Sequence, residues 1–135
     1  MATQRFPIRI GARSRGFVRA LFGATPETAW AEVDADGLKA RFGRFHLETP
    51  LENIATWRIE GPFLWITAIG VRMSVRHRDL SFAGSPHGGV RMNFRVPVPY
   101  GVLRVPAQYV GSDDLDGFAA ALTALGIPGE DSRRA

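Results

Sequence analysis

Ser112-Asp-Asp-Leu-Asp-Gly-Phe-Ala-Ala-Ala-Leu-Thr-Ala-Leu-Gly126 is the stretch that decides the fold class, because it has the features of one complete amphipathic helix. Ser112 is the expected N-cap, and the aspartates that follow it suit the positive end of the helix dipole. Gly126, with Pro128 beyond it, provides the stop signal. The apolar residues form one stripe that must cover another part of the protein: Leu115, Phe118, Ala119, Leu122 and Leu125.

Most of the chain before this helix alternates apolar and polar residues, which is the pattern of half-buried strands. Residues 29–34 and 37–42 alternate on either side of Asp36-Gly37 and predict a hairpin. Residues 97–106 are expected to be an extended edge or a loop, because their prolines donate no hydrogen bond to a ladder. Further strands are expected over 5–10, 45–49, 54–60, 71–75, 80–82, 90–96 and 109–110. About seven strands and a terminal helix predict an α+β fold that is mainly β, with the helix capping an antiparallel barrel or sandwich.

Length and composition fit one folded domain. The 135 residues, 45% of them hydrophobic, suffice for one core, so we expect a domain over 1–128 and a flexible tail over 129–135. The absence of cysteine excludes disulfides, a thiolate nucleophile and cysteine-ligated metals. The first residues form no apolar signal segment, and the longest apolar-rich run, 63–71, is too short to span a bilayer. A cytoplasmic location is therefore expected.

A short basic helix is predicted between Ser14, its cap, and Gly23, its stop. Phe17 and Leu21 lie four residues apart in it, as do Val18 and Phe22. The favoured interpretation is that its large apolar residues pack against the barrel. The alternative is a basic amphipathic segment at the periphery of an anionic membrane, because residues 1–20 carry five arginines and no acidic residue.

The resemblance to a known family is carried by Trp30-Ala-Glu-Val-Asp-Ala-Asp-Gly-Leu-Lys-Ala-Arg-Phe-Gly-Arg-Phe-His-Leu47, followed by Pro50-Leu-Glu-Asn-Ile54 and Trp57-Arg-Ile59. These segments resemble bacterial pleckstrin-homology-like (PH-like) domains, in which a hairpin ends in a Phe-Gly-like corner and a Pro-Leu-x-x-Ile step follows. The stretch Gly89-Val-Arg-Met-Asn-Phe94 is also similar to small uncharacterised actinobacterial proteins of this length. The resemblance implies two orthogonal antiparallel sheets closed by the C-terminal helix. It suggests a binding or assembly module.

The candidate binding residues are four arginines on two predicted strands: Arg72, Arg76, Arg91 and Arg95. Alternation places two of them on one face of each strand, so neighbouring strands would gather all four into a basic patch for an anionic lipid or a protein partner. The other interpretation is a solvated face neutralised by nearby acids, namely Glu32, Asp34, Glu48 and Glu60. These strands show no exposed aromatic residue beside the arginines, which argues against nucleic acid.

No catalytic motif is found. His77-Arg-Asp-Leu80 matches the start of the kinase catalytic loop, but the asparagine and the Asp-Phe-Gly that must follow are missing. The three histidines, His46, His77 and His87, occupy polar, arginine-flanked or turn positions and predict no metal site. We therefore expect a module that is not an enzyme and needs no cofactor. The alternative is a small barrel or helix-grip protein that encloses a flavin-like or lipidic ligand, with Thr25–Trp30 starting its first helix.

Overall fold

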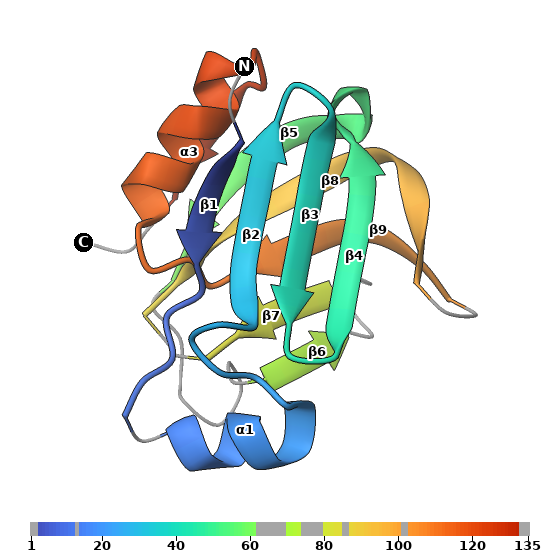
Figure 1. The fold of residues 1–135 in the computed structure, drawn as a ribbon. Helices are drawn as coiled ribbons and strands as arrows, with labels where there is room; N and C mark the ends of the chain where they lie inside the picture. Colours follow the sequence, from blue (N-terminus) through green and yellow to red (C-terminus); the bar gives the residue numbers. More distant parts are fainter. Residues whose placement is uncertain are drawn as a thin grey trace.

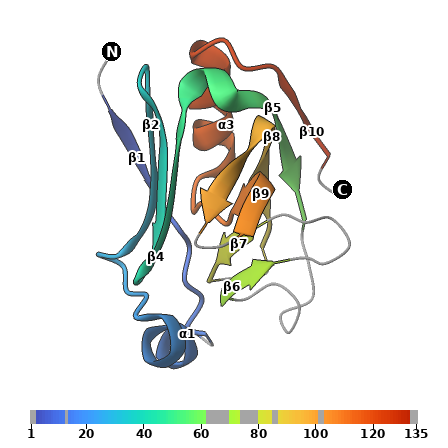
Figure 2. The ribbon, with the colours of Figure 1, turned by 90° about the vertical axis from the view of Figure 1, so that its right-hand side faces the viewer.

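The protein consists of two β-sheets that face each other, with a helix closing one side between them (Figures 1 and 2). The computed structural model describes residues 3–12, 14–61, 70–73, 80–84, 87–100 and 103–132. The described strands form two sheets and no closed barrel. The prediction of a mainly β chain with a terminal helix is thus confirmed, whereas the barrel is not found.

The first sheet is an antiparallel meander in the order β1-β2-β3-β4. Its strands are β1 (Gln4–Pro7), β2 (Ala29–Asp34), β3 (Gly37–Phe42) and β4 (Phe45–Pro50). The predicted hairpin is confirmed, with Val33 opposite Leu38 and Asp34 opposite Gly37. Alternate residues of β2 and β3 are buried, so one face of this sheet covers the core.

The second sheet is mixed, in the order β10-β5-β8-β9-β7-β6. Its strands are β5 (Ile54–Glu60), β6 (Gly70–Met73), β7 (Leu80–Ala83), β8 (Gly89–Tyr100), β9 (Leu103–Val110) and β10 (Gly129–Asp131). The 3₁₀ turn η1 (Leu51–Asn53) joins the two sheets. Two pairs are parallel, β7 with β9 and β10 with β5, so the all-antiparallel expectation is wrong for this sheet.

Two sequence expectations concern the ends of strands: residues 97–106 as an extended edge or a loop, and residues 129–135 as a tail. Residues 97–100 and 103–106 belong to β8 and β9 and form the extended edge, since Val98 pairs with Val105 beyond a register shift that lies between Asn93 and Val98. Strand β5 pairs with β8 only as far as Phe94, which leaves one side of the distal half of β8 open. Prolines spaced two residues apart can turn their nitrogens toward that open side without losing a ladder hydrogen bond. Residues 129–131, expected in the tail, pair with β5 as β10.

The helices are α1 (Arg15–Phe22) and α3 (Leu115–Ala124). Gly23 ends α1 in the left-handed conformation as predicted. The N-cap of α3 is Asp114, whose carboxylate accepts the backbone N–H of Gly117 at 2.9 Å. Ser112 is not the cap, because it forms a buried bridge with Ile8 and its hydroxyl donates to the Asp114 carbonyl.

The core lies between the sheets, and α3 closes it on one side, where the helix contacts β5 and β8 of the second sheet. The predicted stripe of α3 faces inward, with Phe118 fully buried and stacked on Phe6 of β1 at 5.1 Å. Phe42 and Phe82, one from each sheet, stack at 6.2 Å. Aromatic contacts therefore join both sheets and the helix into one apolar core.

The chain segment after β1 also links the two sheets. Its backbone N–H groups at Arg9 and Gly11 donate to the carbonyls of Gly111 and Gly84, both at 2.9 Å. The N–H of Asp113 donates back to the Pro7 carbonyl at 2.7 Å. This segment leads into α1, which lies at one end of the molecule beyond the strands of the first sheet (Figure 1).

Candidate functional site

The three candidate arginines that the structure describes do not lie on neighbouring strands. Arg91 and Arg95 lie on β8, while Arg72 lies on β6, with β9 and β7 between them. Three strand spacings of about 4.8 Å put β6 about 14 Å from β8. Arg76 falls outside the residues that the structure describes.

The two described arginines of β8 are engaged by local groups. The guanidinium of Arg91 donates to the Asn93 side chain at 3.2 Å, and that of Arg95 donates to the Glu52 carbonyl at 2.9 Å. Arg58 of β5 is opposite Arg91 in register and forms ion pairs with Glu60 at 3.6 Å and with Glu130 at 3.4 Å. Carboxylates thus lie beside this row of arginines.

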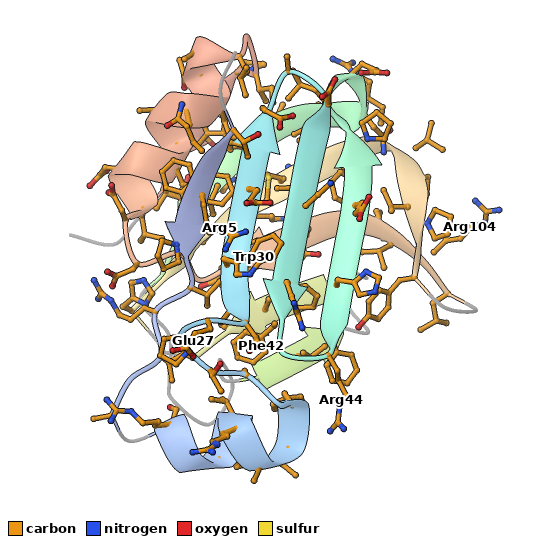
Figure 3. The ribbon with its side chains drawn as sticks, viewed as in Figure 1. Arg5, Glu27, Trp30, Phe42, Arg44 and Arg104 are labelled. Carbon is orange, nitrogen blue, oxygen red and sulfur yellow. The ribbon has the colours of Figure 1, made fainter. Side chains whose placement is uncertain are left out.

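The N-terminal arginines have different environments. Arg5 pairs with Glu32 at 2.7 Å and lies 4.3 Å from the ring of Trp30 (Figure 3). Arg9 pairs with Asp113 at 2.6 Å. Arg15 and Arg19 of α1 form no ion pair within the described part of the chain. These two guanidiniums remain available to an external anion.

Arg15 and Arg19 line one groove of about 500 Å³ between α1 and two neighbouring segments. We call this the α1 groove; its other lining residues come from 7–10 and 24–27, together with Asp113. The floor is partly apolar, with Pro7, Ile8 and Ile10. The site therefore combines cationic side chains with apolar surface.

One carboxylate of the α1 groove keeps its charge at neutral pH. The pKa of Glu27 is lowered because its carboxylate accepts its own backbone N–H and, secondly, the Thr25 hydroxyl. Figure 3 shows Glu27 on the connection from α1 to β2, close to the helix. With Arg9 paired to Asp113, Arg15 and Arg19 exceed this carboxylate by one charge, so the groove favours an anion.

Helix α1 is held against the first sheet along one side. Val18 is fully buried, and the ring of Phe22 packs against Phe42 at 5.9 Å and Phe45 at 6.0 Å. The Arg44 guanidinium donates to the Leu21 carbonyl and its backbone N–H donates to the Phe22 carbonyl at 3.1 Å. These contacts fix the end of α1 to the β3–β4 turn.

Two large apolar residues of α1 are exposed, on one flank of the helix. Phe17 is 44% exposed and Leu21 is 51% exposed, so of the three residues expected to pack inward these two do so only in part, and the ring of Phe17 lies 6.1 Å from that of Phe22. Because successive helix residues are about 100° apart, Gly16 and Ala20 point most directly away from Val18. Phe17 and Leu21 flank them on one side and the α1 groove lies on the other. We call Gly16, Phe17, Ala20 and Leu21 the α1 outer face.

The remaining sequence candidates do not assemble into a site. His46 is exposed on β4, whereas His87 is half-buried beside the Ser112 carbonyl, with 2.7 Å between its Nε2 and that oxygen. His77 lies outside the described residues, as do Arg78 and Asp79 of the kinase-like tetrapeptide. Among the described residues, no three histidine or carboxylate side chains are close enough to hold a metal.

The segment on which the helix-grip alternative depended is not a helix. Residues 26–28 form a turn, in which the backbone N–H of Thr28 donates to the Thr25 carbonyl at 3.0 Å. Strand β2 begins directly afterwards, at Ala29. Thr25 before Pro26 therefore begins a turn that leads directly into β2.

The chain matches no protein-family model, no curated protein and no solved structure. Within the described residues, no helix has the length and apolar composition that crossing a bilayer requires. The assignment of the site therefore depends on the geometry of the described residues. Sequence reasoning singled out the basic helix but not Arg44, because a contact between residues 21 and 44 leaves no local pattern.

Proposed function

We propose that this chain is a non-catalytic binding module that recognises an anionic partner in the α1 groove. The observation that carries the proposal is the pair Arg15 and Arg19, one helical turn apart on the same wall of the groove. Guanidinium groups form strong, charge-assisted hydrogen bonds with phosphate and carboxylate oxygens. The arginine-rich face expected from the sequence is thus assigned to α1 rather than to β8.

The same proposal includes a PH-like arrangement and a place of action at the cytoplasmic periphery of a membrane. The PH-like part is supported by the order of the elements: a four-stranded antiparallel meander, a second sheet, and then a helix that closes one side. It differs in the parallel β7–β9 pair and in α1, which is inserted between β1 and β2. The groove lies at this insertion, so the binding role depends on α1 and not on the PH-like assignment.

A soluble anion tests the proposal without a membrane. Tripolyphosphate titrated into ¹⁵N-labelled protein should shift the amide resonances of α1 and of residues 24–27, and high salt should reverse the shifts because the contacts are ionic. Replacing both groove arginines, Arg15→Gln with Arg19→Gln, should weaken binding at least about tenfold, since hydrogen bonds to charged groups are worth about 1.5–3 kcal/mol each.

Arg104→Gln is the matched control. Arg104 is exposed on β9 and lies at the far end of the β8–β9 hairpin, well away from α1 (Figure 3). This substitution removes one positive charge and should leave tripolyphosphate affinity within about twofold. Equal weakening by Arg104→Gln and by the groove variant, or shifts centred on β8 and β9, would overturn the assignment of the site.

A further inference from the structure

We infer that the anionic partner is the surface of a lipid bilayer, on which the α1 outer face rests while the α1 groove takes a lipid phosphate. This inference rests on the proposed function and adds the identity of the partner. It follows from the arrangement of side chains around α1. Small residues point outward, apolar side chains lie on one flank, and arginines without an ion pair among the described residues lie on the other. A bilayer presents anionic phosphates above apolar chains, and so matches both flanks.

The apolar flank is small but concentrated. Phe17 and Leu21 lie one turn apart and are both about half exposed, so each presents part of its apolar side chain to solvent while the ring of Phe17 also contacts that of Phe22. Together they offer far less area than the roughly 800 Å² that each partner of a specific protein complex buries. Partial insertion into a head-group layer needs no such area, because each buried methylene contributes independently. The size of the patch thus favours a bilayer over a protein.

The residues of α1 that point away from the protein are small, so the helix backbone can approach a flat surface closely. Gly16 has open space where a side chain would be, and Ala20 is exposed. No acidic residue occurs in α1, so no carboxylate would face lipid phosphates from the helix itself. Arg44, at the Leu21 end, adds a further cation beside the apolar flank (Figure 3).

The helix is presented rigidly. Val18 is buried, Gly43 lies in close backbone contact with Phe22, and the Ala24 N–H donates to the Val18 carbonyl at 3.2 Å. A rigid helix loses little conformational entropy when it docks, which compensates for its short apolar flank. The α1 outer face is therefore preformed and does not have to fold on the membrane.

Vesicle sedimentation tests the inference. We expect binding to vesicles of phosphatidylcholine with 30% phosphatidylglycerol, and at least about tenfold weaker binding to pure phosphatidylcholine, because each arginine near an anionic surface contributes about fivefold. Phe17→Ser with Leu21→Ser should weaken binding at least about tenfold. Ala20→Glu should do the same by placing a carboxylate on the α1 outer face. Both variants should keep the wild-type affinity for tripolyphosphate.

The matched control is Val96→Ser with Leu103→Ser. These side chains are 61% and 49% exposed on the β8–β9 hairpin, so the control removes similar apolar area away from α1. It should bind vesicles as the wild type does. Tripolyphosphate binding without vesicle binding would overturn the bilayer as partner and leave the proposed function standing. If the wild-type protein bound neither tripolyphosphate nor vesicles, the proposed function itself would be overturned. Equal binding to neutral and anionic vesicles, or equal losses in the control, would also overturn the inference.

Discussion

Replacing Phe118 by alanine should destabilise the protein more than any change on its exposed surface. The Phe118 side chain is fully buried, and its ring stacks on Phe6 at 5.1 Å with an interplanar angle of 17°. Buried Phe→Ala substitutions cost about 3–5 kcal/mol in the free energy of unfolding, of which a stacked pair accounts for about 0.5–1.5 kcal/mol. Domains of this kind are stable by only about 5–15 kcal/mol, so the loss is a large fraction of the total.

Urea denaturation followed by far-ultraviolet circular dichroism measures this change. Phe118→Ala should lower the midpoint strongly, whereas Phe17→Ala, at a side chain that is 44% exposed, should cost less than about 1 kcal/mol. A double-mutant cycle with Phe6→Ala should show coupling of about 0.5–1.5 kcal/mol. A cost below about 1 kcal/mol for Phe118→Ala would refute the view that α3 seals the space between the sheets.

Three further substitutions test local features. Asp114→Ala removes the N-cap of α3 and should cost about 0.5–2 kcal/mol in urea denaturation. Gly43 has φ +64°, and an added Cβ would lie 2.0 Å from the Phe22 carbonyl oxygen, so Gly43→Ala should cost at least about 2 kcal/mol and lower the melting temperature. The pKa of Asp34 lies below its ordinary 3.8, because its carboxylate accepts the Thr3 hydroxyl and then backbone N–H groups. Thr3→Val should therefore raise the NMR titration midpoint of Asp34. Because the folded-state pKa is the lower one, this carboxylate stabilises the fold above pH 3.8 and the contribution disappears as the pH falls through the folded-state value.

Each of these has a matched comparison. Asp114→Asn keeps an oxygen acceptor and should retain most of the stability that alanine loses. Gly16→Ala, in the open space on α1, should be neutral or stabilising. If Gly43→Ala were as harmless as Gly16→Ala, the close packing of α1 on the β3–β4 turn would be wrong. An unchanged Asp34 midpoint in Thr3→Val would show that the hydroxyl does not determine the pKa.

Local pattern was sufficient for part of this fold. The hairpin over 29–42 and the strand over 54–60 follow from alternation and turn residues, and the structure has them at the predicted bounds. The apolar stripe of α3 could be predicted from the sequence in the same way. The cap of that helix was not, because Ser112 and Asp114 are both good N-caps and the choice is made by a bridge between Ser112 and Ile8, far away in the sequence.

Pairings between distant segments were beyond local pattern. Nothing within β9 indicates that β7 lies parallel to it, and this insertion into the strand order is what separates Arg72 from Arg91. For the candidate site, the basic helix could be predicted but its orientation could not. The exposure of Phe17 and Leu21 accompanies the burial of Val18 and the packing of Phe22 on Phe42 of the first sheet. A helix with apolar residues around half its circumference has more than one way to pack.

The segment carrying α1 leaves and rejoins the first sheet at adjacent points, because the backbone N–H of Ile8 donates to the Ala29 carbonyl at 3.0 Å. The pairing of β1 with β2 thus holds together the two ends of the roughly twenty residues between these points. Lengthening this segment would add little to the conformational entropy that the chain loses on folding. A protein built this way can exchange its recognition element while its sandwich stays the same. Another short helix transplanted into this segment would keep the stability only if it retained an apolar residue at the buried Val18 position and a ring at Phe22, whereas the exposed positions of α1 are open to change.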